Sequence, residues 1–112
     1  MKTFELNLNN QPFVAIKDGL KIVEMRLFDE KRQLMKKGDV IIFKNRDTAE
    51  NIRVKITGLK RFKDFEELYK NYDKIDLGYK ANEEAKPEDM LKYYSQEKQN
   101  KYGVLAIEIE LI

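Results

Sequence analysis

The pattern of apolar and polar residues predicts five strands. Residues 3–8 show it clearly, because Phe4, Leu6 and Leu8 share one side of an extended chain and polar residues occupy the other. The other segments either alternate in the same way or form a short, continuous apolar run, and Gly58 stands where a strand would bulge or bend. The predicted strands are residues 3–8, 20–27, 40–43, 52–57 and 102–111.

The spacing of apolar residues and the capping residues predict three helices. The first helix begins near Asn9 or Asn10 and stops before Gly19, and the second begins at Asp64, where Glu67 completes a sequence resembling a capping box. Pro87 opens the third, which we expect to direct Met90, Leu91 and Tyr94 inward. Residues 73–86 lack periodicity and are predicted to be a long loop of the kind that often lines a site.

The order of these elements favours an α+β domain or a mixed-sheet barrel. Strands and helices do not alternate regularly, as they would in a doubly wound sheet. The chain has 112 residues, of which 42% are hydrophobic, so it can bury one sizeable core. We therefore expect residues 1–112 to form one domain.

Charge is distributed unevenly along the chain. Residues 1–63 carry 15 Lys and Arg against 8 Asp and Glu, whereas residues 64–112 carry 7 against 12. The asymmetry fits a basic, phosphate-facing surface beside an acidic one, and equally fits attraction between the two halves of the molecule.

The absence of cysteine and histidine limits the catalytic and metal-binding chemistry open to this protein. Thiolate nucleophiles, disulfides, imidazole catalysis and zinc held by sulfur or imidazole are excluded. We expect no metal and no cofactor. Glu5 interrupts any apolar signal-peptide core, and no apolar run is long enough to span a membrane, so we expect a cytoplasmic protein without a membrane partner.

One segment suggests a family. Residues 19–26 fit the pattern G-x-K-x-x-E-x-R, with Lys21, Glu24 and Arg26 at its charged positions. Gly38 and Asp39 precede the apolar run, a Phe-Glu-Glu-Leu sequence follows the basic strand end, and Tyr-Gly-Val opens the last strand. In these features, which cover nearly the whole chain, the sequence resembles the ASCH domain family.

The resemblance implies a PUA-like mixed β-barrel of about five strands flanked by two to four short helices. It also implies a cleft at the motif, and family members are regarded as RNA-binding or RNA-processing modules. Chemically, Arg26 offers a planar fork of donors for phosphate or a base edge, and Lys21 offers a compact positive charge. Glu24 can accept from an exocyclic amine or orient Arg26.

Strict alternation places Lys21 on the opposite face from Glu24. The three charged residues meet only if the chain bends near residues 20–22, and Gly19 permits such a bend. A structural ion pair between Glu24 and Arg26 that closes the edge of a core is the competing interpretation.

Within the family, bacterial N4-acetylcytidine amidohydrolases look similar around the motif, with a Lys that handles protons and a Thr nucleophile. Glu24 stands here in place of that Thr. A carboxylate cannot serve as a hydroxyl nucleophile, although it could activate water with help from Lys21. No motif fixes the distant Glu of those enzymes, so none is assigned.

Further binding residues are predicted outside the motif. Lys60 and Arg61 could extend a phosphate track, and Tyr102, like Tyr93 and Tyr94, could stack on an unpaired base. The alternatives are structural roles without a ligand: the cations would lie at a solvated strand end, and Tyr94 would pack in the core.

Three functions remain open from the sequence. The first is a module, expected to be monomeric, that binds RNA or a nucleoside through Lys21, Glu24 and Arg26. The second is a metal-free hydrolase of a modified cytidine or of RNA, with Lys21 and Glu24 as its catalytic residues. The third is a protein-interaction adaptor that docks a basic partner on its acidic half.

Overall fold

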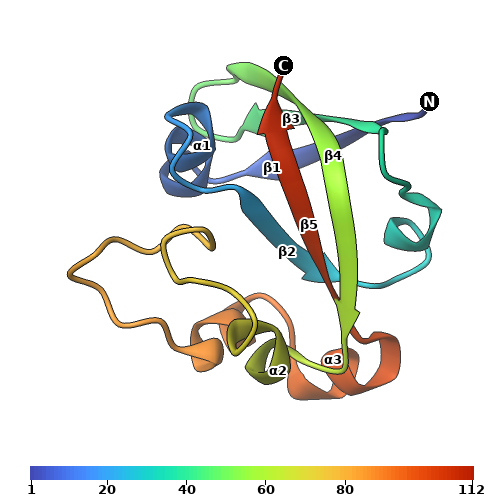
Figure 1. Ribbon diagram of the computed structural model, residues 1–112, viewed down its shortest axis with the longest axis vertical. Coiled ribbons are helices and arrows are strands. Elements are labelled where there is room, and N and C mark those ends of the chain that lie inside the picture. Colours follow the sequence, from blue (N-terminus) through green and yellow to red (C-terminus); the bar gives the residue numbers. More distant parts are fainter.

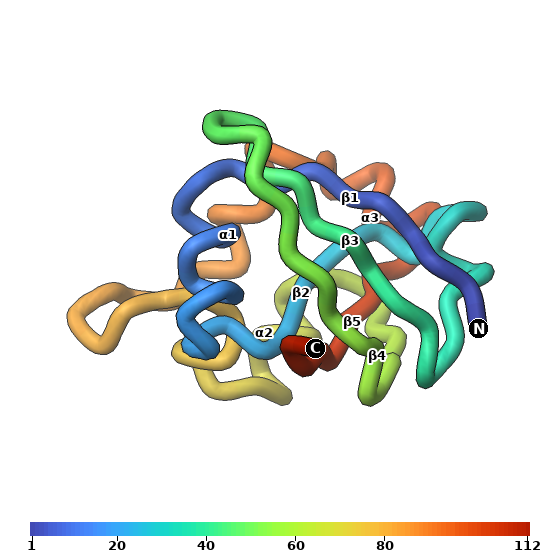
Figure 2. The backbone as a smooth tube through the Cα atoms, turned by 90° about the horizontal axis from the view of Figure 1, so that it is seen from above, coloured from blue at the N-terminus to red at the C-terminus, as the bar shows by residue number.

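A curled five-stranded sheet forms the body of the molecule, as the computed structural model of residues 1–112 shows (Figure 1). Its strands lie in the order β1-β3-β4-β5-β2, and only the β1–β3 pair is parallel. The strands are β1 (Thr3–Leu8), β2 (Val23–Leu27), β3 (Val40–Asn45), β4 (Asn51–Phe62) and β5 (Val104–Leu111). Seen from above, they wrap around a common interior (Figure 2). The expected α+β fold with a mixed sheet of about five strands is confirmed.

Short helices occupy the connections. They are α1 (Asn10–Lys17), α2 (Phe65–Tyr69) and α3 (Gln96–Tyr102), with 3₁₀ turns η1 (Arg32–Leu34) and η2 (Pro87–Lys92). None has the length and apolar composition needed to cross a membrane. Helices α2 and α3 lie together at one end of the sheet, and α1 lies beside the other end (Figure 1).

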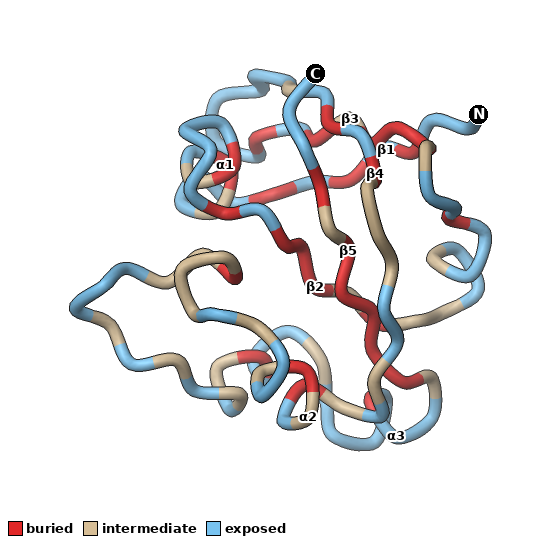
Figure 3. Tube along the Cα trace, in the orientation of Figure 1, coloured by how far each residue is buried: buried red, intermediate tan, exposed pale blue.

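Two apolar clusters hold the sheet between them, and Figure 3 shows the buried residues along β5 and its neighbours. Leu105 and Ile107 of β5 belong to the cluster with α1, whereas Val104 and Ala106 belong to the cluster with α2 and η2. Both faces of β5 are therefore covered along residues 104–107, whereas Glu110 and Leu111 at its end are exposed. The predicted bulge at Gly58 is confirmed as a register shift against β5.

Three details of the predicted elements are wrong. The second strand begins at Val23, three residues later than expected, because Leu20 is 61% exposed and takes part in a turn. The segment after Pro87 is a 3₁₀ turn that leaves Leu91 exposed. A separate helix, α3, follows it and ends at Tyr102, where the last strand was expected to begin. Its start is marked by Ser95, whose hydroxyl accepts from the Lys98 backbone N–H.

Asp64 begins α2 as predicted, since its carboxylate accepts the backbone N–H of Glu67 at 2.9 Å. Asp64→Ala should leave that N–H without its partner and lower the free energy of unfolding by about 1 kcal/mol. Urea denaturation of the two proteins measures the difference. Asp64→Asn, which keeps an accepting oxygen, should lose less, and equal losses in the two variants would rule out the cap as the cause.

Candidate functional site

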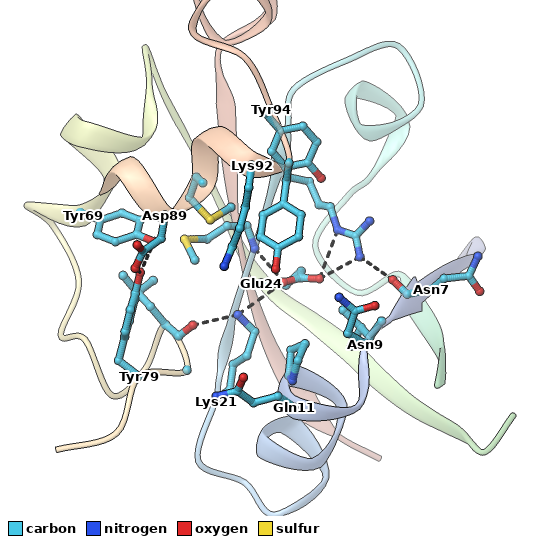
Figure 4. Close-up of a pocket in the computed structure, with 18 of the residues that line it drawn as sticks. Asn7, Asn9, Gln11, Lys21, Glu24, Tyr69, Tyr79, Asp89, Lys92 and Tyr94 are labelled. Atoms are coloured by element: carbon cyan, nitrogen blue, oxygen red, sulfur yellow. Dashed lines mark hydrogen bonds and ion pairs between the residues drawn. The ribbon is translucent and has the colours of Figure 1, made fainter. Parts of the chain in front are cut away.

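A pocket of about 310 Å³ lies between the N-terminal half of the chain and the segment that precedes α3 (Figure 4). The N-terminal side contributes residues from the end of β1, the start of α1 and strand β2. The opposite side comes from α2, from residues 77–83 of the long loop and from η2 with the two tyrosines that follow it. The long loop therefore lines this pocket, and its role in a functional site stays a prediction.

A buried charge cluster forms the floor of the pocket. Lys21 and Glu24 are each only 5% exposed, and the Lys21 Nζ lies 3.4 Å from Glu24 Oε1. Glu24 Oε2 accepts from Arg26 Nε at 3.1 Å and from Arg26 Nη2 at 3.0 Å. The structure therefore brings together the three charged residues of the motif (Figure 4).

The expected bend is what allows Lys21 to join Glu24. Gly19 adopts a left-handed φ of 77°, and the backbone N–H groups of Leu20 and Lys21 both donate to the carbonyl of Ala15 at the end of α1. Regular strand geometry begins only at Val23. The alternation that would separate the Lys21 and Glu24 side chains is thus broken before it starts.

Lys21 also fixes the long loop to the pocket. Its ammonium donates to the carbonyl of Leu77 at 2.9 Å. Gly78 lies against the Lys21 side chain, because a Cβ at this position would stand 3.0 Å from Lys21 Cδ, and its φ is 106°. The N–H groups of Ile22 and Val23 both donate to the carbonyl of Asp76. The loop therefore takes its position from residues of the motif and its immediate neighbours.

Burial and mutual attraction oppose one another in the charge cluster. Burial lowers the pKa of the Lys21 ammonium, with Glu24 opposing the change. Burial acts to raise the pKa of Glu24, but Arg26 and Lys21 outweigh it and the pKa is lowered. Burial likewise acts against the charged form of Arg26, and Glu24 and then Tyr94 raise its pKa. Glu24 is accordingly a carboxylate at neutral pH.

Arg26 has a structural contact in addition to its ion pair. Its Nη2 donates to the carbonyl of Asn7 at 3.0 Å, so the Arg26 guanidinium, which belongs to β2, contacts the end of β1. These two strands are the free edges of the sheet. The competing interpretation of a structural pair that closes a core edge therefore describes one part of what Arg26 does.

Tyrosines form a wall of the pocket that the motif did not predict. Tyr69, Tyr79, Tyr93 and Tyr94 all line it. Tyr94 is half-buried and lies against Phe65, with ring centroids 5.8 Å apart, so it has both a core contact and a surface in the pocket. Tyr93 is 57% exposed. Only the two adjacent tyrosines were candidates from the sequence, since Tyr69 and Tyr79 carried no local signal beyond helix and loop patterns.

Acidic and amide side chains complete the pocket. Asp89 and Glu83 line the side of the loop and η2, and Asn9 and Gln11 line the side of α1. Asp89 was not singled out by the sequence, because nothing local distinguishes it from the other acids near Pro87. No three Asp or Glu side chains gather as a metal-ligand cluster would require.

Three predicted binding residues lie outside the pocket. Lys60 is exposed on β4, 3.8 Å from Glu108, and the Arg61 guanidinium stands 4.8 Å from the ring centre of Phe28. Tyr102 packs against the apolar cluster beneath α2. They form no continuous site with Lys21, Glu24 and Arg26, so a role in binding RNA stays a prediction for a different surface.

Comparison with known proteins gives one consistent result. The family model described as the ASCH domain matches residues 6–112. The crystal structure of hypothetical protein PH0355 has 32% identity and a TM-score of 0.83, covering 98% of this chain and 99% of that one. The solution structure of protein PF0455 from Pyrococcus furiosus has 31% identity and a TM-score of 0.70, with 98% and 97% covered.

The fold extends to more distant structures. The crystal structure of an ASCH domain from Lactobacillus crispatus has 13% identity and a TM-score of 0.63, covering 98% of this chain and 79% of that one. No match was found among the curated proteins. The family and the PUA-like fold expected from the sequence are thereby confirmed.

Proposed function

Because the chain belongs to the ASCH domain family, we propose that it is an RNA-binding or nucleoside-binding module whose site is the pocket around Lys21, Glu24 and Arg26. The proposal rests mainly on one observation. A buried carboxylate holds two cationic side chains in fixed positions at the floor of a pocket that has tyrosines along one wall. Fixed donors beside aromatic faces are the usual means by which proteins bind single nucleotides.

The geometry suits a base or sugar better than a long stretch of backbone. The pocket is about 310 Å³, at the lower end of the range for small-molecule sites, and would enclose one nucleoside. Arg26 keeps part of its donor fork beyond its contacts with Glu24 and Asn7, and can offer it to a base edge or a phosphate. Tyr93, exposed at the rim, offers a ring face for stacking.

Amide chemical-shift titration with cytidine and a short single-stranded RNA tests this function. Arg26→Lys keeps the charge but removes the planar fork, so it should weaken binding of the better ligand about tenfold, the size of one bidentate contact. Lys21→Met should have an effect at least as large. Arg53→Gln, which changes an exposed cation on β4 far along the sheet, serves as the matched control.

Two outcomes would contradict the proposal. The first is no shift with either ligand at millimolar concentration. The second is equal binding by the wild type and by folded Arg26→Lys and Lys21→Met proteins. Binding that disappears only in Arg53→Gln would move the site to the outer surface of β4.

A hydrolase is the second candidate function, and the lowered pKa of Lys21 favours it. Burial lowers the pKa of its ammonium, which moves a proton-handling amine closer to neutral pH. N4-acetylcytidine added to the same sample would reveal turnover by the appearance of cytidine and acetate. Turnover that is lost in Lys21→Met would make the protein an enzyme, and stable N4-acetylcytidine with shifts in the pocket would support the binding module.

A further inference from the structure

Three polar groups on the aromatic wall form a hydrogen-bonded chain. The Tyr69 and Tyr79 hydroxyls lie 2.9 Å apart, and the Tyr79 hydroxyl donates to Asp89 Oδ2 at 2.8 Å. The Tyr79 hydroxyl also lies 3.3 Å from the carbonyl of Lys86, a second and more distant acceptor. Because a phenol has a single proton, and Tyr79 directs it to one of these two acceptors, Tyr69 is the donor to Tyr79. Figure 4 shows the three side chains together across the pocket from Lys21.

Both tyrosines of this chain have raised pKa values. Burial raises the pKa of Tyr79, and its hydrogen bonds with Tyr69 and Asp89 raise it further. Burial also raises the pKa of Tyr69. Both phenols therefore stay protonated at neutral pH, and the nearest acceptor of the Tyr79 proton is Asp89 Oδ2. Asp89 Oδ1 accepts no hydrogen bond from the protein.

Glu24, by contrast, has no free lone pair with which to accept a hydrogen bond from a ligand. A carboxylate offers about four lone-pair positions. Glu24 Oε1 faces the Met25 N–H at 3.0 Å and the Lys21 ammonium at 3.4 Å, and Oε2 takes both donors of Arg26. A donor group on a ligand would have to displace one of these buried contacts.

We propose that Asp89, held by Tyr79, is the residue that selects the base, by accepting a hydrogen bond from an exocyclic amine. The inference rests on the proposed function, since it assumes a nucleoside in this pocket. An acceptor-only carboxylate favours the amine of cytosine or adenine. It repels the carbonyl oxygen that replaces this amine in uracil or hypoxanthine. The ligand class is therefore an amino-substituted nucleoside, alone or within RNA.

Besides Glu24 and Asp89, one further acid lines the pocket, Glu83, and it is the alternative candidate for the selecting residue. Its Oε1 accepts from the backbone N–H of Lys80 at 2.7 Å, which ties it to the long loop rather than to the tyrosine chain. Its second oxygen has no protein donor, so it is an alternative acceptor in the same cavity. Glu83→Gln tests that alternative directly.

Two matched ligand pairs test the proposal, cytidine with uridine and adenosine with inosine, each titrated at equal salt. Wild-type protein should bind the amino member of the better pair about tenfold more tightly. Asp89→Asn should remove or reverse this preference, because an amide N–H₂ can face the carbonyl while the amide oxygen still accepts from Tyr79. Tyr79→Phe should reduce the preference. Glu84→Gln, which changes an exposed acid outside the pocket, should leave it unchanged.

The outcomes separate this inference from the proposed function. Equal wild-type affinity for both members of each pair, with weaker binding in Arg26→Lys, would overturn the role of Asp89 and leave the binding module standing. A preference that survives Asp89→Asn but disappears in Glu83→Gln would assign selection to Glu83. Absence of binding by any nucleoside or RNA would overturn both.

Discussion

Glu24→Ala should lower the free energy of unfolding by about 3 to 5 kcal/mol, the cost of leaving buried cations without their partner. Lys21 and Arg26 are both largely buried, and Glu24 is the only carboxylate within 4.0 Å of either one. Its removal also frees the Met25 N–H and loosens Lys21, which fixes the loop at Leu77. Urea denaturation at neutral pH measures the loss.

An exposed ion pair provides the control for Glu24. Glu50 accepts from Lys17 at 2.6 Å on the surface, and Glu50→Ala should leave the free energy of unfolding nearly unchanged, because water solvates both charges when the pair breaks. If Glu24→Ala and Glu50→Ala were equally stable, the buried cluster would not contribute to folding.

The contribution of Glu24 should also depend on pH in a definite direction. Its pKa in the folded protein is lowered from the ordinary value of 4.5, so its stabilising effect is present above that pH. As the pH falls through the folded-state pKa, both states bind the proton and the effect disappears. The stability difference between the wild type and Glu24→Gln should therefore shrink below about pH 4.5, while a constant difference would contradict the assignment.

Phe65→Ala should lower the free energy of unfolding by about 3 to 5 kcal/mol and disturb the pocket as well. Phe65 is 1% exposed in the cluster beneath α2, and its ring stacks on Tyr94 with an interplanar angle of 26°. The cavity left by its ring would remove the support on one side of Tyr94. Urea denaturation gives the loss, and the amide shifts of residues 90–94 report the change in the wall.

Phe65→Leu separates volume from aromatic contact. It fills most of the space and should lose much less stability than Phe65→Ala, because the cavity term is small. It should still shift the resonances around Tyr94, which would lose the ring beneath it. Equal destabilisation by the two substitutions would show that the cavity is not the cause.

The local parts of the fold followed from local patterns. The Thr3–Leu8 strand, the Asp64 cap and the Gly58 bulge each depend on a few neighbouring residues whose spacing or hydrogen bonding decides the backbone. Burial on both faces of β5 was not predictable in the same way. It depends on α1 and α2 packing from opposite sides, which no alternation within residues 104–111 records.

The candidate site likewise has one part that the sequence predicted and another part that only the structure revealed. By itself the sequence determined that Lys21, Glu24 and Arg26 belong to one motif, that Gly19 permits a bend beside it, and that cysteine and histidine chemistry is absent. The tertiary structure alone placed Asp89 and Tyr79 opposite that motif, because their positions come from a long loop and a 3₁₀ turn whose paths are fixed by distant contacts. It alone also separated Lys60, Arg61 and Tyr102 from the pocket. Charge and aromaticity name the residues that can bind a ligand, and packing decides which of them face the same space.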